Sequence, residues 1–526
     1  MPAVGAAEAA PQIALPRDYN AAVDLVERHL KAGRGDKTAY IDDRGSLTFA
    51  ELAERVDRAA NAFRRLGIEQ EQRVLLCLLD TVDFPVAFLG AIKAGIVPIP
   101  VNTLLTARDY DFMLRDSRAR ALVVSDALYD RIAPVLTKQP ALRHVIVSGS
   151  EGVSGRLAFS QLLAEADPHA KAAVTTVDDP CFWLYSSGST GTPKGAVHLQ
   201  SHLIHTAELY AKPVIGISES DTIYSVAKLF FAYGLGNALS FPLAVGATTI
   251  LYAERPTPAS VARILKEKRP SLFYGVPTLY AAMLASPELP RREEVAMRLC
   301  ISAGEALPEE IGRRWTQRFG VEILDGLGST EMLHIFLSNR PGAVRYGTSG
   351  VPVPGYQIRL VGDDGNEVPP GEIGELHVSG PTSATQYWNN RERSRSTFLG
   401  PWTRSGDKYI RDSDGYYTYC GRSDDMLKVG GIYVSPFEVE AALMTHEAVL
   451  EAAVVGHADE QQLIKPRAFV VLRPGLSGSA ALAQELQQHV KSRLAPYKYP
   501  RWIEFIAELP KTATGKTQRF KLRDWA

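Results

Sequence analysis

The chain has 526 residues and carries 58 lysines and arginines against 59 aspartates and glutamates, so its formal net charge is -1. At roughly 150 residues per domain, this length corresponds to about three or four domain-sized units. The near-zero charge excludes binding of nucleic acid through bulk positive charge. Hydrophobic residues make up 45% and charged residues 22%, which excludes a long disordered polymer.

The cysteines and the amino-terminal region indicate the compartment. The four cysteines are scattered and form no CxxC motif, so neither a zinc knuckle nor a dithiol redox site is suggested, and their low number fits a reducing compartment. The first twenty residues lack the basic start and apolar core of a secretory signal. Residues 84–101 are the most apolar stretch, but Lys93, Gly95, Pro98 and Pro100 interrupt it, whereas a membrane span needs about 20 unbroken apolar residues. We therefore expect a soluble, cytoplasmic protein without a membrane partner.

The first 180 residues alternate helical and strand-like patterns. Apolar residues at helical spacing predict a helix within residues 47–66, with Gly67 as its stop, and a second helix at residues 84–94. Short apolar runs predict strands that are buried on both faces, and these runs lie at residues 73–79, 96–101, 121–125 and 144–147. Repeated strand and helix predict a largely parallel sheet covered by helices.

A second block of this kind spans residues 220–335, with strands expected at residues 248–252, 272–276 and 299–304. From about residue 340, glycine and proline become frequent and segments shorten, which predicts antiparallel β structure in a small barrel. Charge density rises after Gly421, and the remaining chain of about 105 residues is long enough to fold alone. The predicted fold is α/β. Its large N-terminal domain, residues 1–421, holds two parallel-rich sheets and a β-barrel-like subdomain, and residues 422–526 form a small, mobile α+β domain.

The segment from Tyr185 to Gly195 carries the strongest functional signal. Its three glycines allow successive backbone N–H groups to converge on an anion. Four hydroxyl side chains between Ser187 and Thr192 add donors, and Lys194 adds a positive charge, which suits a polyphosphate. The segment is not a Walker loop, because Gly195 rather than Ser or Thr follows Lys194. A flexible linker is the alternative, but a linker gives no reason for the ending Thr-Pro-Lys-Gly beside an apolar strand.

At this loop the sequence resembles the acyl-adenylate-forming enzymes, which include acyl-CoA synthetases, luciferases and peptide-synthetase adenylation domains. Five more segments follow in the family's order. They resemble its adenine-side loop, its Tyr-Gly-x-Thr-Glu segment, its ribose aspartate motif, its interdomain hinge and its C-terminal lysine loop, and they lie at residues 302–308, 325–331, 403–407, 421–431 and 510–516. Chance is a poor explanation for six ordered matches over more than 300 residues.

The resemblance implies a binding site for ATP and Mg²⁺. The implied ATP-binding residues are Ser186, Ser187, Gly188, Ser189, Thr190, Gly191, Thr192, Lys194, Gly304, Glu305, Ala306, Asp325, Gly326, Leu327, Gly328, Ser329, Thr330, Asp407, Arg422 and Lys516. Glu331 is the implied metal ligand, since Mg²⁺ prefers one or two carboxylates plus phosphate oxygens. Asp407 can accept both ribose hydroxyls, and Arg422 can approach the same sugar or a phosphate. For either of these two alone, a surface ion pair is the simpler interpretation.

The implied catalytic residues are Lys516, Lys428, Thr330 and Glu331. We assign Lys516 to adenylation, because a cation that bridges carboxylate and α-phosphate stabilises the charge of the transition state. In the family, the C-terminal domain rotates between two half-reactions, and Asp424 matches the pivot. We expect this rotation to bring Lys428 over the acyl-adenylate. Gly430 and Gly431, without Cβ atoms, would then admit the narrow pantetheine arm of coenzyme A.

Residues 227–234 and 328–336 look most like those of the benzoate–CoA ligases. By that resemblance, the acyl pocket contains Ala227, Lys228, Phe231, Tyr233, Gly328, His334 and Ile335. The sequence departs from the wider family at three positions: Lys228 replaces the usual Pro, Phe231 the usual His and Leu327 the usual Tyr. Core packing is the alternative for Phe231 and Tyr233, and a structural role is the alternative for His334. No polar anchor for a ring hydroxyl or amino group is evident, which favours benzoate over hydroxylated relatives.

The predicted function is therefore ATP-dependent ligation of benzoate, or a close aromatic acid, to coenzyme A through an aroyl-AMP. The alternatives are a medium-chain fatty acyl-CoA ligase, a stand-alone adenylation enzyme that loads a carrier protein, and a nucleotide-binding regulatory module. Intact Lys516 and Glu331 argue against the regulatory module, and no carrier-protein Ser motif follows Lys516. We expect a monomer or homodimer. Relatives are switched off by acetylation of the matching lysine, so a lysine acetyltransferase acting on Lys516 is a candidate partner.

Overall fold

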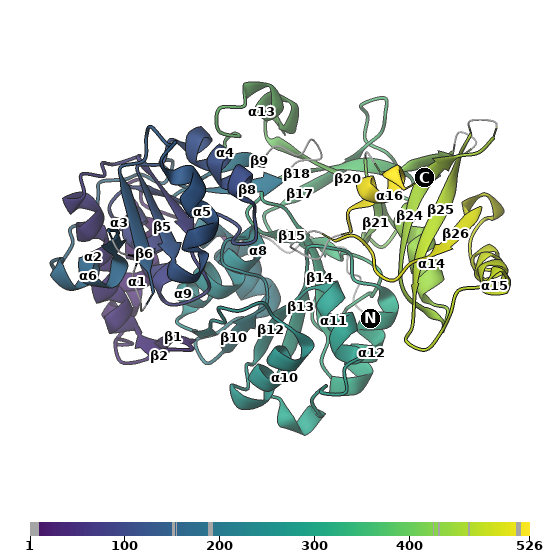
Figure 1. Cartoon of the computed structure of the whole chain (residues 1–526), viewed down its shortest axis with the longest axis horizontal. Coiled ribbons are helices and arrows are strands. Elements are labelled where there is room, and N and C mark those ends of the chain that lie inside the picture. The colour runs from purple at the N-terminus through teal and green to yellow at the C-terminus, as the bar shows by residue number, and fades with distance from the viewer. Residues whose placement is uncertain are drawn as a thin grey trace.

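The computed structural model describes residues 10–149, 153, 155–187, 193–423, 425–429, 432–460, 463–511 and 517–525, except for the side chains of Ser187, Lys428, Ile432, Tyr433 and Pro496. Figure 1 shows two α/β layers on the left and in the centre, antiparallel strands above them, and the C-terminal elements on the right. The fold is mixed α/β with parallel-rich sheets, as the sequence predicts.

The largest sheet joins strands from two parts of the chain, residues 38–48 and 222–352, in the order β16-β15-β14-β13-β12-β10-β11-β1-β2. Its pairs are parallel from β14 to β1 and antiparallel at both ends. The strands are β1 (Thr38–Asp42), β2 (Gly45–Thr48), β10 (Thr222–Ser225), β11 (Thr248–Ile250), β12 (Leu272–Gly275), β13 (Leu299–Ser302), β14 (Ile323–Gly328), β15 (Ile335–Ser338) and β16 (Val351–Pro352). The carboxyl ends of the parallel strands meet at one edge, where open α/β sheets bind ligands.

The second sheet has the order β4-β3-β5-β6-β7 and is parallel throughout. Its strands are β3 (Arg73–Cys77), β4 (Val97–Pro100), β5 (Ala121–Ser125), β6 (His144–Ser148) and β7 (Leu157–Ala158). Every residue of β4 and β5 is buried. Continuous apolar runs therefore correspond to strands covered on both faces.

Capping residues and glycines in the local sequence set the ends of the helices. The long α2 starts after Thr48, whose side chain forms a capping box with Glu51, and stops before Gly67 at a φ of 70°. The helices are α1 (Ala21–Lys31), α2 (Phe49–Arg65), α3 (Asp83–Lys93), α4 (Ala107–Ser117), α5 (Tyr129–Leu136), α6 (Phe159–Glu165), α7 (His202–Thr206), α8 (Ala232–Leu235), α9 (Phe241–Val245), α10 (Pro258–Glu267), α11 (Pro277–Leu284), α12 (Glu309–Phe319), α13 (Arg391–Thr397), α14 (Pro436–Met444), α15 (Ala480–Lys491) and α16 (Arg519–Asp524). Shorter helical turns lie at Asp126–Leu128, Ala207–Ile215, Gly236–Ser240, Arg292–Glu294 and Pro496–Lys498.

Antiparallel strands link the two sheets to the C-terminal region. Strands β8 (Pro180–Ser187) and β9 (Pro193–Leu199) form an antiparallel hairpin. The residues that connect them, 188–192, belong to the segment predicted to bind phosphate and are called the phosphate-type loop. A further sheet runs β17-β18-β20-β19, with β21 also on β20, and it is the barrel-like unit expected after residue 340. Its strands are β17 (Gln357–Val361), β18 (Ile373–Ser379), β19 (Phe398–Leu399), β20 (Trp402–Arg411) and β21 (Tyr417–Arg422).

The C-terminal elements form a small α+β unit. It contains β22 (Leu427–Val429), β23 (Ile432–Val434), β24 (Val449–Ala458), β25 (Ile464–Leu472) and β26 (Trp502–Phe505), together with α14, α15 and α16. Its buried residues, such as Val454 and Leu486, make a hydrophobic cluster of their own. Phe437 of α14 packs edge-on against Tyr419 of β21, with ring centroids 5.5 Å apart. The boundary at residues 421 and 422 remains a prediction.

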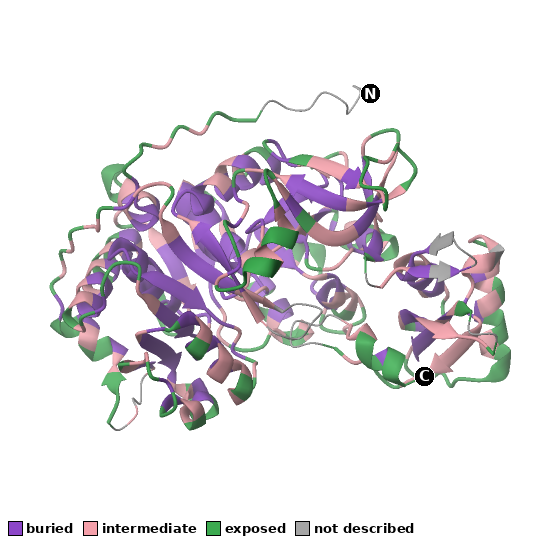
Figure 2. Ribbon diagram, turned by 90° about the horizontal axis from the view of Figure 1, so that it is seen from above, coloured by how far each residue is buried: buried purple, intermediate pink, exposed green. Residues whose placement is uncertain are grey.

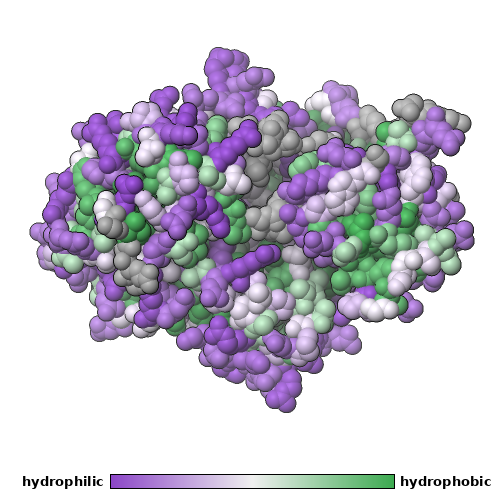
Figure 3. Space-filling view, viewed as in Figure 1, coloured by the Kyte–Doolittle hydropathy of each residue, from purple (hydrophilic) through white to green (hydrophobic). Residues whose placement is uncertain are grey.

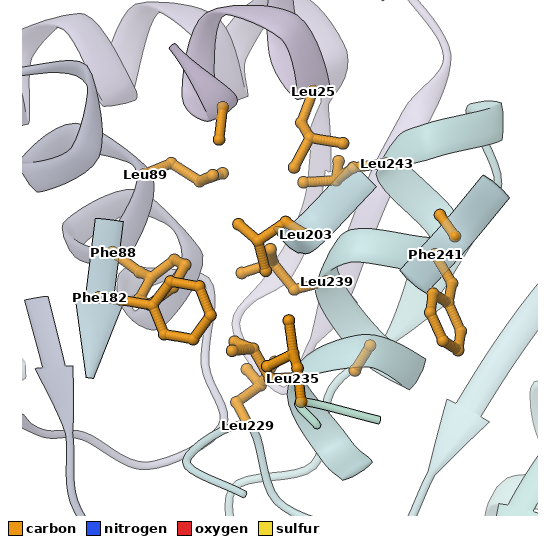
Figure 4. Packing of buried hydrophobic residues seen from close by; sticks show 14 of the residues in the cluster. Leu25, Phe88, Leu89, Phe182, Leu203, Leu229, Leu235, Leu239, Phe241 and Leu243 are labelled. Atoms are coloured by element: carbon orange, nitrogen blue, oxygen red, sulfur yellow. The ribbon is translucent and has the colours of Figure 1, made fainter. Parts of the chain in front are cut away.

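The main core lies between the two large sheets. Figure 4 shows Phe88 of α3 and Phe182 of β8 packed together, with Leu203 and Leu239 beside them. Helices α10 to α12 cover the other face of the largest sheet with residues such as Trp315, which is fully buried. Figure 2 shows buried residues along the inner strands and exposed residues on the outer helices. None of the helices in the described part of the chain combines the length and apolar character of a membrane span. Hydrophilic residues cover most of the face in Figure 3.

Candidate active site

Glu331 lies where the β8–β9 hairpin meets the end of β14. Ser186 and Lys194 face each other in the register of the hairpin, directly before and after the phosphate-type loop. The Ser186 hydroxyl donates to Glu331 Oε1 at 3.3 Å. Residues on β14 pass from buried at Asp325 and Gly326 to half-buried at Leu327 and Gly328. The strand therefore leads to a half-buried turn at residues 329–331, where Glu331 meets Ser186 of the hairpin.

Tyr387 connects Glu331 with Lys194. Its hydroxyl donates to Glu331 Oε1 at 2.7 Å and accepts from Lys194 Nζ at 3.4 Å. The Lys194 ammonium also lies 4.6 Å from the centre of the Tyr387 ring, at cation–π distance. Burial lowers the pKa of Lys194, and the nearby Glu331 carboxylate opposes that shift. The two charges are held close together by one phenol.

A buried histidine holds the backbone next to Glu331. His198 Nε2 donates to the Thr330 carbonyl oxygen at 2.8 Å, and the other ring nitrogen, Nδ1, is 3.0 Å from His202 Nδ1. The His198 ring stacks on Phe182, and burial lowers its pKa to about 4. Leu333 follows with a φ of 66°, a left-handed conformation that costs a branched residue free energy. Such strain persists only where the surrounding contacts impose it.

Asp325 ties the adenine-side loop to the sheet. Its Oδ2 atom accepts from the Leu307 backbone N–H at 3.3 Å, and its carbonyl oxygen accepts from Asn339 N at 3.0 Å. The Asp325 side chain is buried, which raises its pKa far above the usual range of a carboxylic acid. Gly304 is exposed with a φ of 94°, and Glu305 and Ala306 are half-buried. Residues 304–306 are therefore the accessible part of this region, and the buried Asp325 side chain holds the loop through the Leu307 N–H.

The predicted ribose residues lie opposite each other on neighbouring strands. Asp407 of β20 pairs in register with Arg422 of β21, and their side chains form an ion pair at 3.1 Å. Gly406 adopts a φ of 74°, and a Cβ atom there would stand 2.9 Å from the Arg422 guanidinium. The glycine thus allows Arg422 to cross the turn and reach Asp407.

Aromatic rings surround His334 in the predicted acyl pocket. Its ring centroid is 5.7 Å from that of Tyr233 and 4.5 Å from that of Phe241. His334 Nε2 lies 3.2 Å from both the Tyr233 carbonyl oxygen and Asn237 Oδ1. Burial lowers the pKa of His334 to about 3, so the imidazole is neutral near pH 7. Because a Cβ atom at Gly236 would lie 2.2 Å from the His334 ring, only glycine fits there.

The other predicted acyl residues divide into two groups. Ile335 is buried in β15, and Gly328 lies against the His334 backbone, where a Cβ atom would be 2.6 Å from the carbonyl oxygen. Phe231 is half-buried and precedes α8. Ala227 and Lys228 border Gly234, but the Lys228 ammonium donates to the Glu254 carbonyl oxygen at 2.7 Å, away from the His334 cluster.

Several predicted residues lie outside the described part of the chain. They are Gly188, Ser189, Thr190, Gly191, Thr192, Asp424, Gly430, Gly431 and Lys516. The side chains of Ser187 and Lys428 are also outside it, although their backbones belong to β8 and β22. The positions of these groups in the site remain predictions.

The donor set around Glu331 suits Mg²⁺. No described residue donates a hydrogen bond to Glu331 Oε2, so that oxygen faces no competing donor there. The described residues contain no cluster of three or more His, Cys, Asp or Glu side chains that could hold a metal. One carboxylate oxygen plus phosphate oxygens is the environment that Mg²⁺ prefers over an all-protein cage.

Tyr387 and His198 are the two site residues that the sequence did not reveal. Tyr387 lies 56 positions after Glu331 and is brought to it because residues 385–388 pair with β9. His198 lies within β9 and reads as an ordinary strand residue. A Tyr-Trp pair after an antiparallel strand was the only local signal, and it does not specify which acid the tyrosine contacts.

Tyr387→Phe is expected to lower kcat/KM for adenylate formation by about 10- to 100-fold, because it removes a hydrogen bond to a charged group. The ring remains, so the contact with Lys194 is kept. Pyrophosphate exchange measured against Mg²⁺ concentration tests this, and we expect a higher Mg²⁺ requirement. Tyr19→Phe is the matched control, since its hydroxyl also donates to a carboxylate, Asp24, at 2.7 Å. Equal activity of the two variants would contradict the prediction.

The Glu331 carboxylate, Ser186 and Lys194 of the β8–β9 hairpin, and the aromatic surroundings of His334 lie around the end of β14. This arrangement suits enzymes that activate a carboxylic acid with a nucleotide. Comparison with protein-family models agrees with this class. The model of the AMP-binding enzymes matches residues 26–388, and that of the AMP-binding enzyme C-terminal domain matches residues 438–516. The chain belongs to the AMP-binding enzyme family.

Individual relatives match over nearly the whole length. The benzoate–CoA ligase of Thauera aromatica is 63% identical over 515 residues, which cover 98% of this chain and 97% of that protein. The 4-hydroxybenzoate–CoA/benzoate–CoA ligase of Rhodopseudomonas palustris is 52% identical, covering 97% of this chain and 94% of the relative. The crystal structure of a benzoate CoA ligase from Burkholderia xenovorans LB400 superposes with a TM-score of 0.90 at 58% identity, covering 96% of this chain and 100% of that one.

Proposed function

We propose that this protein ligates benzoate, or a closely related aromatic acid, to coenzyme A with ATP, and releases AMP and pyrophosphate. The observation that carries the proposal is the 63% identity with the Thauera benzoate–CoA ligase across 98% of the chain. The buried aromatic surroundings of His334 support an aromatic rather than an aliphatic acid.

In the first half-reaction, a carboxylate oxygen of the acid attacks the α-phosphorus of ATP. An oxygen–phosphorus bond forms, the bond to the β-phosphate breaks, and pyrophosphate leaves with the electron pair. Lys194 and the hairpin loop hold the phosphates, the Asp407 side binds the ribose, and Lys516 bridges the two reacting anions. Positioning and fixed positive charge lower the barrier, because both reactants are negatively charged.

Glu331 would hold Mg²⁺, with Tyr387 and Ser186 fixing its Oε1 atom. When bound, the metal neutralises the charge that develops on the phosphate oxygens. The His198 contact with the Thr330 carbonyl oxygen keeps the backbone of this turn in place. These residues thus orient the carboxylate before the nucleotide arrives.

In the second half-reaction, the sulfur of coenzyme A attacks the carbonyl carbon of the aroyl-AMP. A carbon–sulfur bond forms, the carbon–oxygen bond to the phosphate breaks, AMP leaves, and the thiol proton passes to solvent. We assign Lys428, Gly430 and Gly431 to this step, after residues 422–526 rotate about Asp424. A single small domain with two working faces lets one pocket perform both steps.

Three finer points belong to the same proposal. We propose that the protein is cytoplasmic, that it works as a monomer or homodimer, and that acetylation of Lys516 by a lysine acetyltransferase switches it off. Acetylation removes the positive charge that adenylation needs. Mass spectrometry of the protein from its native cells, followed by an assay of the acetylated form, tests the last point.

AMP formation with a panel of acids tests the proposed function. With ATP, Mg²⁺ and coenzyme A present, we expect benzoate to give the highest kcat/KM, ahead of 4-hydroxybenzoate and of hexanoate or octanoate. Omission of coenzyme A should leave pyrophosphate exchange but no thioester. Preference for octanoate would make the protein a medium-chain ligase, thioester formation only on a carrier protein would make it a carrier loader, and an absence of exchange with every acid would make it a binding module.

A further inference from the structure

Asp80 is a buried carboxylate at the carboxyl end of the second sheet. It follows β3 by three residues, and its side chain is 5% exposed. Its Oδ1 atom accepts the backbone N–H of Leu229 at 3.2 Å, and its Oδ2 atom lies 4.0 Å from Lys228 Nζ. Asp80 thus contacts two consecutive residues, Lys228 and Leu229, in the segment that follows β10 of the other sheet.

Lys228 extends the connection to a third segment. Its ammonium donates to the carbonyl oxygens of Tyr252 and Glu254, which follow β11, and its side chain is 17% exposed. The ammonium also lies 5.6 Å from the centre of the Tyr252 ring. One ion pair therefore fastens the end of β3 to the ends of β10 and β11, across the junction of the two sheets.

Burial opposes the ionisation of Asp80. Burial raises the pKa of Asp80 to about 6, although Lys228 and the Leu229 N–H act in the opposite direction. An acid whose pKa is higher in the folded than in the unfolded state destabilises the fold at neutral pH, and its contribution improves as the pH falls through that pKa. Ionised Asp80 therefore carries a desolvation cost at neutral pH, which its contacts with Lys228 and the Leu229 N–H reduce.

The segment that holds Lys228 and Leu229 leads directly into the proposed acyl pocket. The Lys228 carbonyl oxygen accepts the N–H of Phe231 at 3.0 Å, which closes a tight turn. The Leu229 side chain lies beside Leu235 in the core (Figure 4). A Cβ atom at Gly234 would lie 2.0 Å from the Lys228 carbonyl oxygen. Gly234 of α8 is therefore packed directly against this turn.

The turn also contacts the aromatic wall. Tyr233 follows it by two residues, and its carbonyl oxygen lies 3.2 Å from His334 Nε2. The Tyr233 hydroxyl donates to the Gly275 carbonyl oxygen at the end of β12. A shift of the Leu229 backbone would therefore move Phe231 and Tyr233 relative to His334, because no flexible linker separates them.

We propose that the Asp80–Lys228 ion pair is a positioning device that sets the shape of the acyl pocket, and through it the affinity and selectivity for the ring of the acid. Neither side chain takes part in bond making. The inference rests on the proposed function, because it assigns the residues 227–233 to the wall of the acid site.

Asp80→Asn tests the proposal, since the amide keeps the size of the side chain and removes its charge. We expect the KM for the acid to rise about tenfold, because small displacements of positioning groups are costly, while the KM for ATP changes less than twofold. The melting temperature is measured in parallel, because the substitution leaves Lys228 without its ionic partner and a loss of stability must be separated from the change in KM. We also expect a weaker preference for benzoate over ring-substituted acids.

The pH dependence gives a second readout. In the unsubstituted protein, the KM for the acid should rise as the pH falls from 7 to 5, because Asp80 takes up a proton and the ion pair is lost. The same rise should be absent from Asp80→Asn. The charged and titratable groups that face this pair are Tyr224 beside Asp80, and Asp43, Glu254 and Tyr252 beside Lys228.

A buried lysine elsewhere supplies the matched control. Lys93 of α3 is 7% exposed and pairs with Asp57 of α2 and with Glu27 of α1, and none of the three belongs to the segment 227–233. Asp57→Asn should lower the melting temperature and leave the KM for the acid unaltered. Lys228→Gln and the double variant complete a cycle, and the double variant should be no worse than the worse single one, since the pair acts as a unit.

An unchanged KM in Asp80→Asn, or additive effects in the cycle, would overturn the positioning role. If Asp80→Asn does not fold, the pH profile of the unsubstituted protein and Lys228→Gln still decide the question. All assays use the acid that the unsubstituted protein turns over best in the panel. If benzoate is the wrong acid, the acid panel shows it. If the ion pair has no positioning role, only the KM values of the Asp80 and Lys228 variants show it.

Discussion

Lys516→Ala is expected to lower the rate of adenylate formation by about a thousandfold or more, while thioester formation from supplied aroyl-AMP continues. The reason is electrostatic. A carboxylate must approach an anionic phosphate, and a lysine between them stabilises the charge that builds up in the transition state and not in the separate reactants. Single-turnover measurement of AMP formation, with and without added aroyl-AMP, separates the two steps.

Lys428→Ala is the reciprocal variant in the same C-terminal unit. It should retain pyrophosphate exchange and slow the transfer of the aroyl group to coenzyme A. Both substitutions remove one lysine from residues 422–526, so a general loss of folding would affect both variants alike and appear in their melting temperatures. Equal loss of both half-reactions in both variants would contradict the assignment of one lysine to each step.

Glu331→Gln is expected to reduce adenylate formation by about a hundredfold, with a large increase in the Mg²⁺ concentration that half-saturates the enzyme. The amide is close in size to the carboxylate and can still accept from Tyr387, so the turn after β14 should survive. What is lost is the negative charge that a hard divalent cation requires. Calorimetric titration of ATP with and without Mg²⁺ measures that loss independently of turnover.

The control for Glu331→Gln is Glu27→Gln. Glu27 is also a partly exposed carboxylate that pairs with a lysine, at 3.0 Å from Lys93, but it lies on α1. This control should bind Mg²⁺ and ATP as the unsubstituted protein does. If Glu331→Gln binds Mg²⁺–ATP with unaltered affinity, Glu331 is not the metal ligand, and its contacts with Tyr387 and Ser186 serve the fold alone.

Local patterns predicted the helices and the buried strands well, because their causes are local. The apolar run at residues 73–79 became β3 of a parallel sheet, and the helix stop at Gly67 follows from the left-handed backbone of that glycine. The glycine-rich loop was recognisable for the same reason, since its residue types act through backbone freedom and side-chain donors within eleven positions. The antiparallel region after residue 340 was also correctly predicted.

Contacts between distant segments were not predictable in this way. Tyr387 meets Glu331 only because the stretch after β18 pairs with β9, and Asp80 meets Lys228 only because two separate sheets adjoin. The burial of the Asp325 carboxylate and its contact with the Leu307 N–H were likewise not evident from the motif, and the assignment of Asp325 to the nucleotide stays a prediction. Burial depends on what covers a residue, and no local pattern carries that information.

The sequence by itself determined the kind of chemistry. Residue types suited to binding phosphate, to ligating a hard cation and to bridging two anions stand in a fixed order, and their chemical capacities do not depend on the rest of the fold. Tertiary structure alone decided which groups hold these residues in place: a phenol against a carboxylate, an imidazole against a backbone carbonyl, and a buried ion pair across two sheets. The physical reason is that side-chain chemistry is local, whereas orientation comes from chain segments that only folding brings together.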